Sequence, residues 1–331
     1  MTRASARLGV ALLGAMAAVT MAAPAIAPHE PGRQIVDMSY APPMRPRIFD
    51  VEGRPRRPFV YPLRLVDRLT HTFAEDRTVR VPLHFFHAGS LVNTDASTPW
   101  LPLGGDALGR DVFARLVLGA RLSLGVSLAA TAGALVLGAL IGATAGFYGG
   151  RLDDLLMRLA DFVLVLPAIY VVIVLRGTMP LVLNTWPVFW IMAGILSIVG
   201  WPFSARGVRA IVAGERTKEY AEAATALGAS SWRILLRHLL PAARSFLAIQ
   251  GTLLVPAFIL AEATLSFVGF GFAEPTPSWG VMLHDAAQAG TLADAPWLLS
   301  PAAAIVITVL SLHLAAGFRE PLAAVRSMTG R

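Results

Sequence analysis

The stretch KEYAEAATALGASSWRILLRHLLP, at Lys218–Pro241, decides how the rest of the chain is interpreted. Its first half is rich in alanine, the residue with the highest helix propensity. Gly228 stands where this first helix is expected to stop, because glycine adopts a left-handed cap without steric cost. Ser230 or Ser231 is expected to cap a second helix, which Pro241 would end. The expected apolar positions of the second helix are Trp232, Leu235, Leu236 and Leu239.

This predicted hairpin lies between long apolar runs, and the whole chain is too apolar for a soluble domain of its size. Of its 331 residues, 55% are hydrophobic and 15% are charged, and the mean hydropathy is +0.61. Runs of about twenty apolar residues are long enough to cross a bilayer, so we expect an all-α polytopic membrane protein with about six transmembrane helices. The spans are expected at Leu8–Ala27, Leu122–Tyr148, Phe162–Leu175, Trp186–Ser204, Phe246–Phe270 and Trp297–Ala316.

The first apolar run allows two interpretations. It ends in Ala25-Ile26-Ala27, which resembles the cleavage site of a secretory signal peptide. Pro28 follows this site directly and disfavours cleavage, and the run is long enough to span. We therefore expect residues 1–28 to form an N-terminal transmembrane anchor.

The segment 29–120 differs from the rest of the chain, because its composition up to about Trp100 changes to Pro, Arg and aromatic residues and no apolar run there is long enough to span. The segments Phe59–Pro62 and Val79–Leu83 favour short strands interrupted by prolines. His84 and His87 are a candidate metal pair, but no third ligand is near in the sequence, and a structural role is favoured. We expect an extracytoplasmic insert with an amphipathic lead-in to the second span.

The hairpin spacing resembles the EAA loop of the permease subunits of ABC importers. The matching residues are Glu222, Ala223, Ala224, Gly228, His238, Leu240 and Pro241. In that family the loop is a coupling helix that docks into a cleft on the ATPase subunit. The general motif has Ile where this chain has His238, but peptide permeases often have His there. Periodicity alone would also allow an ordinary loop between membrane helices.

Further motifs resemble the C-type permease subunits of dipeptide, oligopeptide and nickel importers, which carry a GTD-x-x-GRD signature followed by G-x-R-x-S-L. This chain has Gly109-Arg110-Asp111 and then GARLSL at Gly119–Leu124, with Gly105 where Thr is usual. The segments EATLSFVG at Glu262–Gly269 and PSWGVML at Pro277–Leu283 extend the resemblance. Near the C-terminus, Ala315-Ala316 replaces a usual Gly-Asp pair.

The resemblance implies a MetI-like permease bundle at residues 121–317, with the cytoplasmic coupling loop at 206–244 and a cytoplasmic tail at 318–331. It implies transport of di- or oligopeptides by alternating access. The implied partners are two ATP-binding subunits, a second related permease subunit and an extracytoplasmic substrate-binding protein. No cofactor is expected in this chain, because ATP and Mg would be bound by the partner subunits. A nickel-specific importer subunit is an alternative.

Charge predicts the orientation, because positive residues in short loops stay in the cytosol. Seven basic residues lie in the hairpin loop, and the loop after the fifth span has none. The hairpin is therefore expected inside, with both termini, in a bacterial inner membrane. The net charge of +7 is explained by such loops, so lipid rather than nucleic acid is the expected partner. The basic residues of the loop are Arg206, Arg209, Arg216, Lys218, Arg233, Arg237 and Arg244.

Motifs for catalysis are missing from the sequence. It has no Cys, no HExxH and no GxSxG. Lys218 is the sole lysine and follows Thr217, so a GK-containing phosphate loop is impossible. If ATP drives this protein, another subunit must bind it. An ion-driven secondary transporter is an alternative, but it would need inverted repeats, and the sequence has no such symmetry.

Two features inside the spans are noteworthy. Glu262 lies in the fifth span, where an ionised carboxylate at the bilayer centre costs about 3 kcal/mol. It is expected to face the bundle or a wet pathway, either in the translocation path or in a hydrogen bond between helices. Gly138, Gly142 and Gly146 recur every four residues and predict a close helix contact, within this chain or with a partner.

Overall fold

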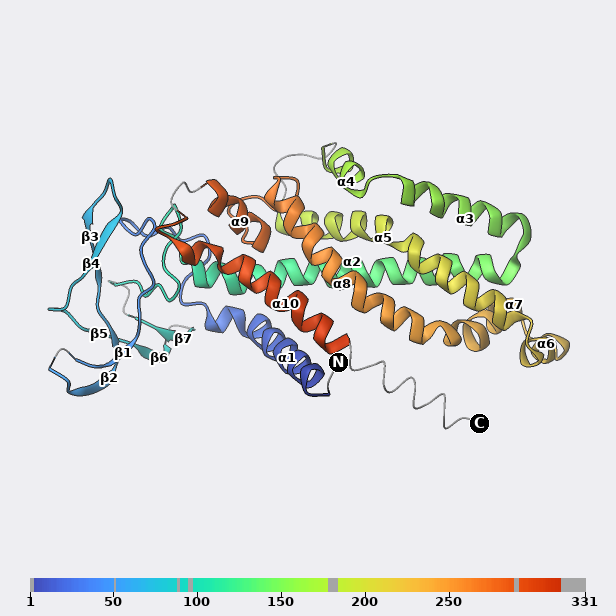
Figure 1. Cartoon of the computed structure of the whole chain (residues 1–331), viewed down its shortest axis with the longest axis horizontal. Helices are drawn as coiled ribbons and strands as arrows, with labels where there is room; N and C mark the ends of the chain where they lie inside the picture. Colours follow the sequence, from blue (N-terminus) through green and yellow to red (C-terminus); the bar gives the residue numbers. More distant parts are fainter. Residues whose placement is uncertain are drawn as a thin grey trace. The chain divides into compact units, whose positions relative to one another are not determined.

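The computed structural model describes residues 3–50, 52–87, 90–94, 98–177, 184–288 and 292–316. The chain divides into two compact units. Unit 1 contains Gly125–Glu262 and the residues from Leu312 onward, and unit 2 contains Thr2–Leu124 and Ala263–Ser311. Unit 2 thus includes the expected anchor and insert. Figure 1 shows the elements in chain order, from blue to red.

Within the described residues, five helical stretches are long and apolar enough to cross a membrane, which confirms a multi-pass membrane protein. Helix α2 has 37 residues and, at 1.5 Å per residue, is roughly 55 Å long, well beyond the hydrocarbon thickness. The stretches are α1 (Arg3–Ile26), α2 (Val112–Tyr148), α5 (Thr185–Arg216), the helical run Ser231–Phe267, and α10 (Ser300–Ala316) with the 3₁₀ turn η3 (Pro296–Leu299) before it.

The expected span at Phe162–Leu175 is divided between two shorter helices. Helix α3 covers Gly150–Val165 and α4 covers Ala168–Gly177. Leu166 between them has an extended backbone, with φ −72° and ψ 123°. Pro167 explains this break, because a proline disfavours the helical conformation of the residue before it.

In unit 1 the glycine stripe packs α2 closely against α5. A Cβ atom at Gly142 would collide with the carbonyl oxygen of Ala205, and one at Gly146 would lie 2.5 Å from the carbonyl oxygen of Arg209. Close approach of the two backbones therefore requires glycine at these positions. Of the two uses that the sequence allows for the stripe, the structure shows the contact within the chain.

Unit 2 holds the described strands, in three small antiparallel sheets. The three-stranded sheet has the order β1-β2-β5, and β3 pairs with β4 and β6 with β7. Pro55 at the start of β2 and Pro82 on the edge strand β5 stand where a missing N–H is tolerated, and Pro58 lies inside the central strand β2. The strands expected at Phe59–Pro62 and Val79–Leu83 are confirmed only in part, because β2 ends before Pro62 and β5 begins after Val79. The strands are β1 (Arg47–Phe49), β2 (Pro55–Val60), β3 (Leu63–Asp67), β4 (Thr72–Glu75), β5 (Val81–Pro82), β6 (His84–His87) and β7 (Ser90–Asn93).

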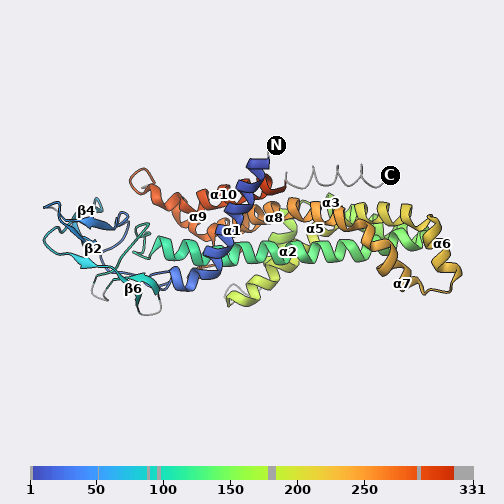
Figure 2. The same cartoon turned by 90° about the horizontal axis from the view of Figure 1, so that it is seen from below.

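Helices of unit 2 pack beside one another. Helix α1 lies beside α10 in Figure 1 and crosses it at an angle in Figure 2, with the Thr308 hydroxyl oxygen 3.3 Å from the Met16 sulfur. The short helix α9 (Trp279–Gln288) packs on the start of α2, where Met282 and Ala286 share a buried cluster with Val112. Asn93 of β7 donates a hydrogen bond to the Pro28 carbonyl, just beyond α1.

Candidate functional site

The turn of the hairpin has the geometry expected for its glycine. Helix α6 covers Glu219–Ala226, and Gly228 has φ +78°. The Gly228 N–H donates to the Thr225 carbonyl, and the Ala229 N–H donates to the Ala224 carbonyl at 3.1 Å. These two bonds make a Schellman cap, in which a left-handed residue satisfies the last carbonyls of the helix. The predicted stop at Gly228 is confirmed.

The second helix begins as predicted but does not end at Pro241. Ser230 occupies the cap position of α7 (Ser231–Ile234), although its side chain makes no capping bond. A π-helical turn at Leu235–Leu239 and a 3₁₀ turn at Leu240–Ala243 then lead directly into α8 (Arg244–Phe267). The prediction was wrong because Pro241 lies in the first turn of a new helical segment, where its missing N–H is not needed.

The buried side of the hairpin packs on α5. Ile234, Leu235 and Leu239 form one cluster with Val208 and Val212 of that helix. Leu235 and Leu239 are confirmed as core positions, but Trp232 and Leu236 are 59% and 39% exposed. The helical face turns at the π segment, so the regular spacing fails there.

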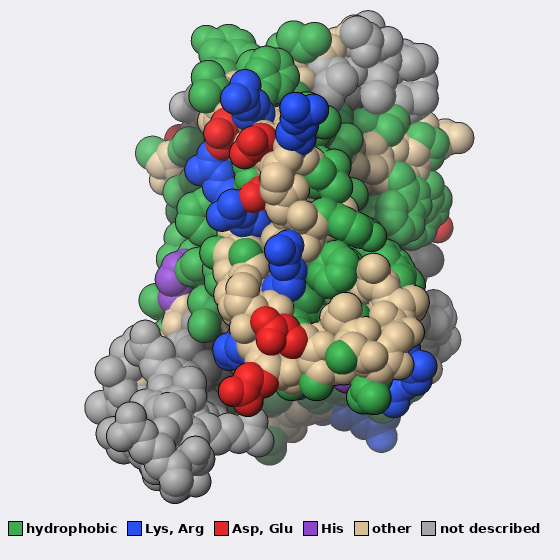
Figure 3. All heavy atoms as spheres, turned by 90° about the vertical axis from the view of Figure 1, so that its right-hand side faces the viewer, with side chains coloured by type: hydrophobic (Ala, Val, Ile, Leu, Met, Phe, Trp, Pro, Cys, Tyr) green, Lys and Arg blue, Asp and Glu red, His purple; other side chains and the backbone are tan. Residues whose placement is uncertain are grey.

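The motif residues lie mainly on the outer side. Glu222, Ala223, Gly228 and His238 are exposed, and Ala224, Leu240 and Pro241 are half-buried. Large apolar side chains are exposed among them, and Figure 3 shows charged and hydrophobic side chains intermixed on the face that carries α6 and α7. Apolar surface rimmed by charges is typical of a protein interaction site. The exposed apolar residues are Tyr220, Leu227, Trp232 and Leu236.

Polar contacts fix the start of the hairpin to the end of α5. Lys218 Nζ lies 2.7 Å from Glu215 Oε1, and the Tyr220 hydroxyl donates to Glu215 Oε2 at 2.7 Å. This bond to a carboxylate raises the pKa of Tyr220 to about 12. Arg209 of α5 also binds Asp153 of α3, with Nε 3.0 Å from Oδ1. Two of the seven basic residues that predict orientation, Lys218 and Arg209, therefore also hold the start of the hairpin and α3 in place.

A second group of polar residues lies in unit 2, at the GGDALGRD loop. Gly104 and Gly109 have φ of +79° and +70°, in the region that favours glycine. Gly105 replaces the usual Thr, and any side chain there would collide with the Met38 carbonyl oxygen. The Asp106 carboxylate accepts hydrogen bonds from the N–H groups of Leu108 and Arg110. The loop is therefore tightly closed on itself.

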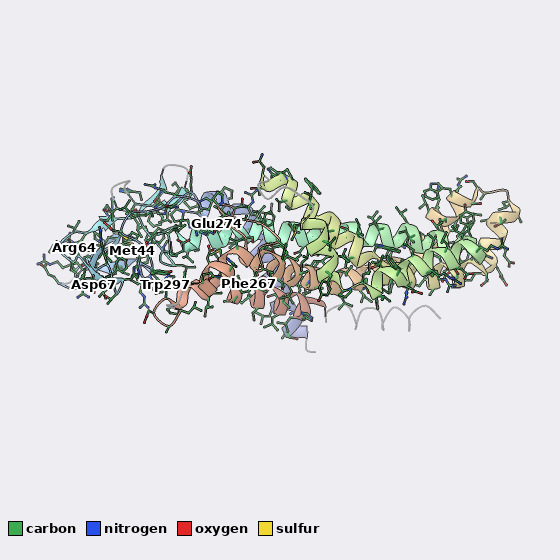
Figure 4. All side chains as sticks on the ribbon, turned by 90° about the horizontal axis from the view of Figure 1, so that it is seen from above. Met44, Arg64, Asp67, Phe267, Glu274 and Trp297 are labelled. Atoms are coloured by element: carbon green, nitrogen blue, oxygen red, sulfur yellow. The ribbon has the colours of Figure 1, made fainter. Side chains whose placement is uncertain are left out.

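Arg110 and Arg115 are buried, with side chains 4% and 1% exposed. Arg110 Nη2 lies 3.0 Å from Asp285 Oδ2 on α9, and Arg115 Nη2 lies 2.6 Å from Glu274 Oε1 before α9. Glu274 is labelled in Figure 4. Arg110 also binds Glu274, and its Nε lies 2.6 Å from Asp106 Oδ2. The sequence reasoning missed this group, whose one available signal was Arg110 in the GRD motif.

These contacts displace two carboxyl pKa values in opposite directions. Burial, together with the hydrogen bond to Glu274 and its charge, raises the pKa of Asp285 to about 6. Burial also acts to raise the pKa of Glu274, but hydrogen bonds from Arg115 and Asp285 and the two arginine charges leave it below its ordinary value. The carboxyl pair therefore holds a shared proton at mildly acid pH.

Asp111, the last residue of the GRD motif, joins two parts of unit 2. Its Oδ1 accepts the N–H groups of Phe113 and Ala114 and so caps α2. Its Oδ2 lies 3.0 Å from Nδ1 of His29, which follows α1. Both side chains are buried, so this link fixes the start of α2 to the end of α1.

Two other predicted positions are placed as follows. Glu262 is fully buried in α8, as expected for a residue that avoids lipid, and its role in transport stays a prediction. His84 lies in β6, opposite Asn93 of β7. In the part of the chain that the structure describes, no three His, Asp or Glu residues are placed to hold a metal ion.

Comparisons with known proteins agree on one kind of protein. A family described as "Binding-protein-dependent transport system inner membrane component" matches residues 134–318. The oligopeptide transport system permease protein OppC of Bacillus subtilis is 38% identical over 221 residues, which cover 66% of this chain and 70% of that protein. OppC of Lactococcus lactis is 35% identical over 208 residues, 63% of this chain and 69% of the relative. The glutathione transport system permease protein GsiD of Pectobacterium atrosepticum is 33% identical over 245 residues, 72% and 77% of the two chains.

Proposed function

Because the chain belongs to the family of inner membrane components of binding-protein-dependent transport systems, we propose that it is the permease subunit of an ATP-driven ABC importer for di- or oligopeptides. The curated relatives named as oligopeptide, dipeptide and glutathione permeases support this substrate class. The observation that carries the proposal is the exposed hairpin, continuous with α8 and packed on α5.

The hairpin is the proposed coupling element. Its Schellman cap and its buried cluster with Val208 and Val212 make it one rigid body with the end of α5. A push on the exposed face at Glu222 and His238 would therefore move α5 and α8, the second of which carries Glu262. Rocking of packed helices is a known route from one open side to the other.

The proposed partners follow from what this chain does and does not carry. Two ATP-binding subunits would dock on the hairpins and bind ATP and Mg, since Lys218 is the sole lysine and follows Thr217. A second, related permease subunit would complete the pathway, because the relatives are C-type permease proteins. An extracytoplasmic binding protein would deliver the substrate, as the family description indicates.

The proposed topology places the protein in a bacterial inner membrane with both termini and the loop at 206–244 in the cytoplasm. Residues 1–28 would be the anchor, 29–120 the extracytoplasmic insert and 121–317 the bundle. The tail at 318–331 lies outside the described residues.

Reconstitution tests the function. The chain would be co-expressed with its neighbouring permease and ATPase genes, purified, and sealed in liposomes with ATP inside or an ion gradient across the membrane. Uptake of peptides that requires the binding protein and ATP is expected. Uptake driven by the ion gradient alone would favour a secondary transporter, and uptake of nickel without peptides would favour a nickel importer. Activity of a complex with this permease alone would contradict the heteromer.

A further inference from the structure

Five charged side chains meet in unit 2 around the start of α2. Arg110 and Arg115 supply two positive charges, and Asp106, Glu274 and Asp285 supply three negative charges when ionised. One negative charge is therefore in excess when all three carboxylates are ionised. Both arginines are almost fully buried, and the Glu274 and Asp285 side chains are 38% and 25% exposed, so this excess charge is only partly solvated.

The group joins segments that are far apart in the sequence. Arg110 and Arg115 come from the entry to α2, Glu274 from the segment between α8 and α9, and Asp285 from α9. Arg115 also donates to the Pro31 carbonyl, after α1, at 3.4 Å. Helix α9 has 10 residues and is too short to span a membrane. Its attachment to α2 depends on side chains rather than on a bilayer.

A small pocket lies within this group. It is lined by apolar residues of α2 and α9, among them Met282 and Ala286, together with Asp106, Arg115, Asp285 and Tyr40. The charged groups that face Asp285 are Arg110, Arg115 and Glu274, and Asp106 and Tyr40 line the same pocket. The pocket is therefore a place where release of α9 would admit solvent.

We propose that Arg110 and Arg115 are positioning residues that hold α9 and the segment before it on the entry to α2, and that this hold is tightest when Glu274 and Asp285 share one proton. With the proton bound, two positive and two negative charges balance. Without it, the two carboxylates lose the hydrogen bond between them and repel one another, and α9 is released more often. Release would detach α9 and the segment before it from the start of α2.

The direction of the pH effect follows from linkage. Asp285 has a pKa of about 6 when α9 is held, against an ordinary value of 3.8 when it is solvated. The held arrangement binds more protons, so its stability falls as the pH rises from about 4 through 6. The equilibrium constant for release of α9 is then expected to increase about tenfold between pH 5 and pH 7.5. The lowered pKa of Glu274 acts in the opposite sense only below its ordinary value of 4.5, outside this window.

Cysteine accessibility tests the proposal, since the chain has no native cysteine. Ala286→Cys is buried in the pocket, and Val66→Cys lies on β3 at a position 65% exposed. The rate of maleimide labelling of the full chain is measured in permeabilised membranes from pH 5 to 7.5, and the ratio of the two rates corrects for thiol ionisation. The ratio should rise about tenfold. Met282→Cys, in the same pocket, replaces Ala286→Cys as the buried labelling site if the Ala286→Cys variant does not assemble.

Variants of Asp285 separate positioning by a shared proton from a purely structural role. In the Asp285→Asn background the ratio should stay low and nearly constant with pH, while Asp285→Glu should restore the rise. Asp294→Asn, at an exposed carboxylate in the segment after α9, should leave the pH-dependent rise of the labelling ratio unchanged. A constant ratio in the parent, or an unchanged rise with Asp285→Asn, would overturn the proposal. Labelling needs no transport, so failure of the peptide-importer proposal would be recognised separately.

Discussion

Arg216, the last residue of α5, donates a hydrogen bond to the carbonyl oxygen of Phe147, one residue before the end of α2. The C-terminal ends of the two helices therefore lie together. Contacts of Gly138 with Ser204 and of Gly146 with Arg209 run in the same order along both helices, so α2 and α5 are parallel. In a membrane the chain between them must return to the opposite side, and α3 and α4 are the available elements. This supports six crossings, one of them broken at Pro167.

The proposed topology predicts a labelling pattern. Val66→Cys, in the insert, should react with a membrane-impermeant maleimide in intact cells, because the proposed topology places that segment outside. Ser230→Cys, at the exposed turn of the hairpin, should react only after permeabilisation. The reaction is followed by a mass shift of the purified chain. Labelling of Ser230→Cys alone in intact cells would reverse the topology.

Substitution of Gly228 is expected to cost conformational strain of the backbone rather than a steric clash. Its φ is +78°, and no atom lies within 4 Å of where a Cβ would stand. Gly228→Ala should therefore lower the free energy of unfolding by about 1–2 kcal/mol, and Gly228→Val by more, because β-branched residues tolerate positive φ poorly. Substrate-stimulated ATPase activity should fall as the hairpin turn distorts.

The control for Gly228 is Gly214→Ala in α5. Gly214 also has open space around its Cβ position, but its backbone is helical. Alanine there should leave stability unchanged or raise it by about 0.5–1 kcal/mol. Equal losses of ATPase stimulation in both variants would contradict a role for the left-handed cap.

Much of this site follows from local sequence, and the rest depends on contacts that local patterns do not contain. Gly228 could be predicted because its neighbours alone dictate a helix stop. The path of the chain at Pro241 could not, because the π turn before it is a packing solution. The link from Arg115 to Glu274 crosses 159 positions of sequence, so only folding reveals that charges from α2, from α9 and from the segments before these helices meet.

Glu222 should matter for coupling and not for folding. The side chain is exposed on α6, where substitutions usually change stability by less than about 0.5 kcal/mol. Glu222→Lys should leave expression and thermal unfolding unchanged while abolishing substrate-stimulated ATPase activity of the assembled complex. Glu219→Lys makes the same charge change three residues earlier on the same helix and should retain most of the stimulation. Normal stimulation in Glu222→Lys would refute its assignment to the ATPase contact.

Substitution of Gly142, in contrast to that of Glu222, is expected to impair folding. A Cβ there would collide with the backbone carbonyl of Ala205, which no side-chain rotation can relieve. Gly142→Ala should therefore force α2 and α5 apart and cost about 1–3 kcal/mol, as overpacked contacts do. Gly194→Ala, where no atom lies within 4 Å, is the matched control and should behave as the parent. Thermal unfolding of the purified complexes measures both. If Gly142→Ala instead kept its thermal stability but lost the second permease on purification, the stripe would belong to the interface between subunits and the contact with α5 would be dispensable.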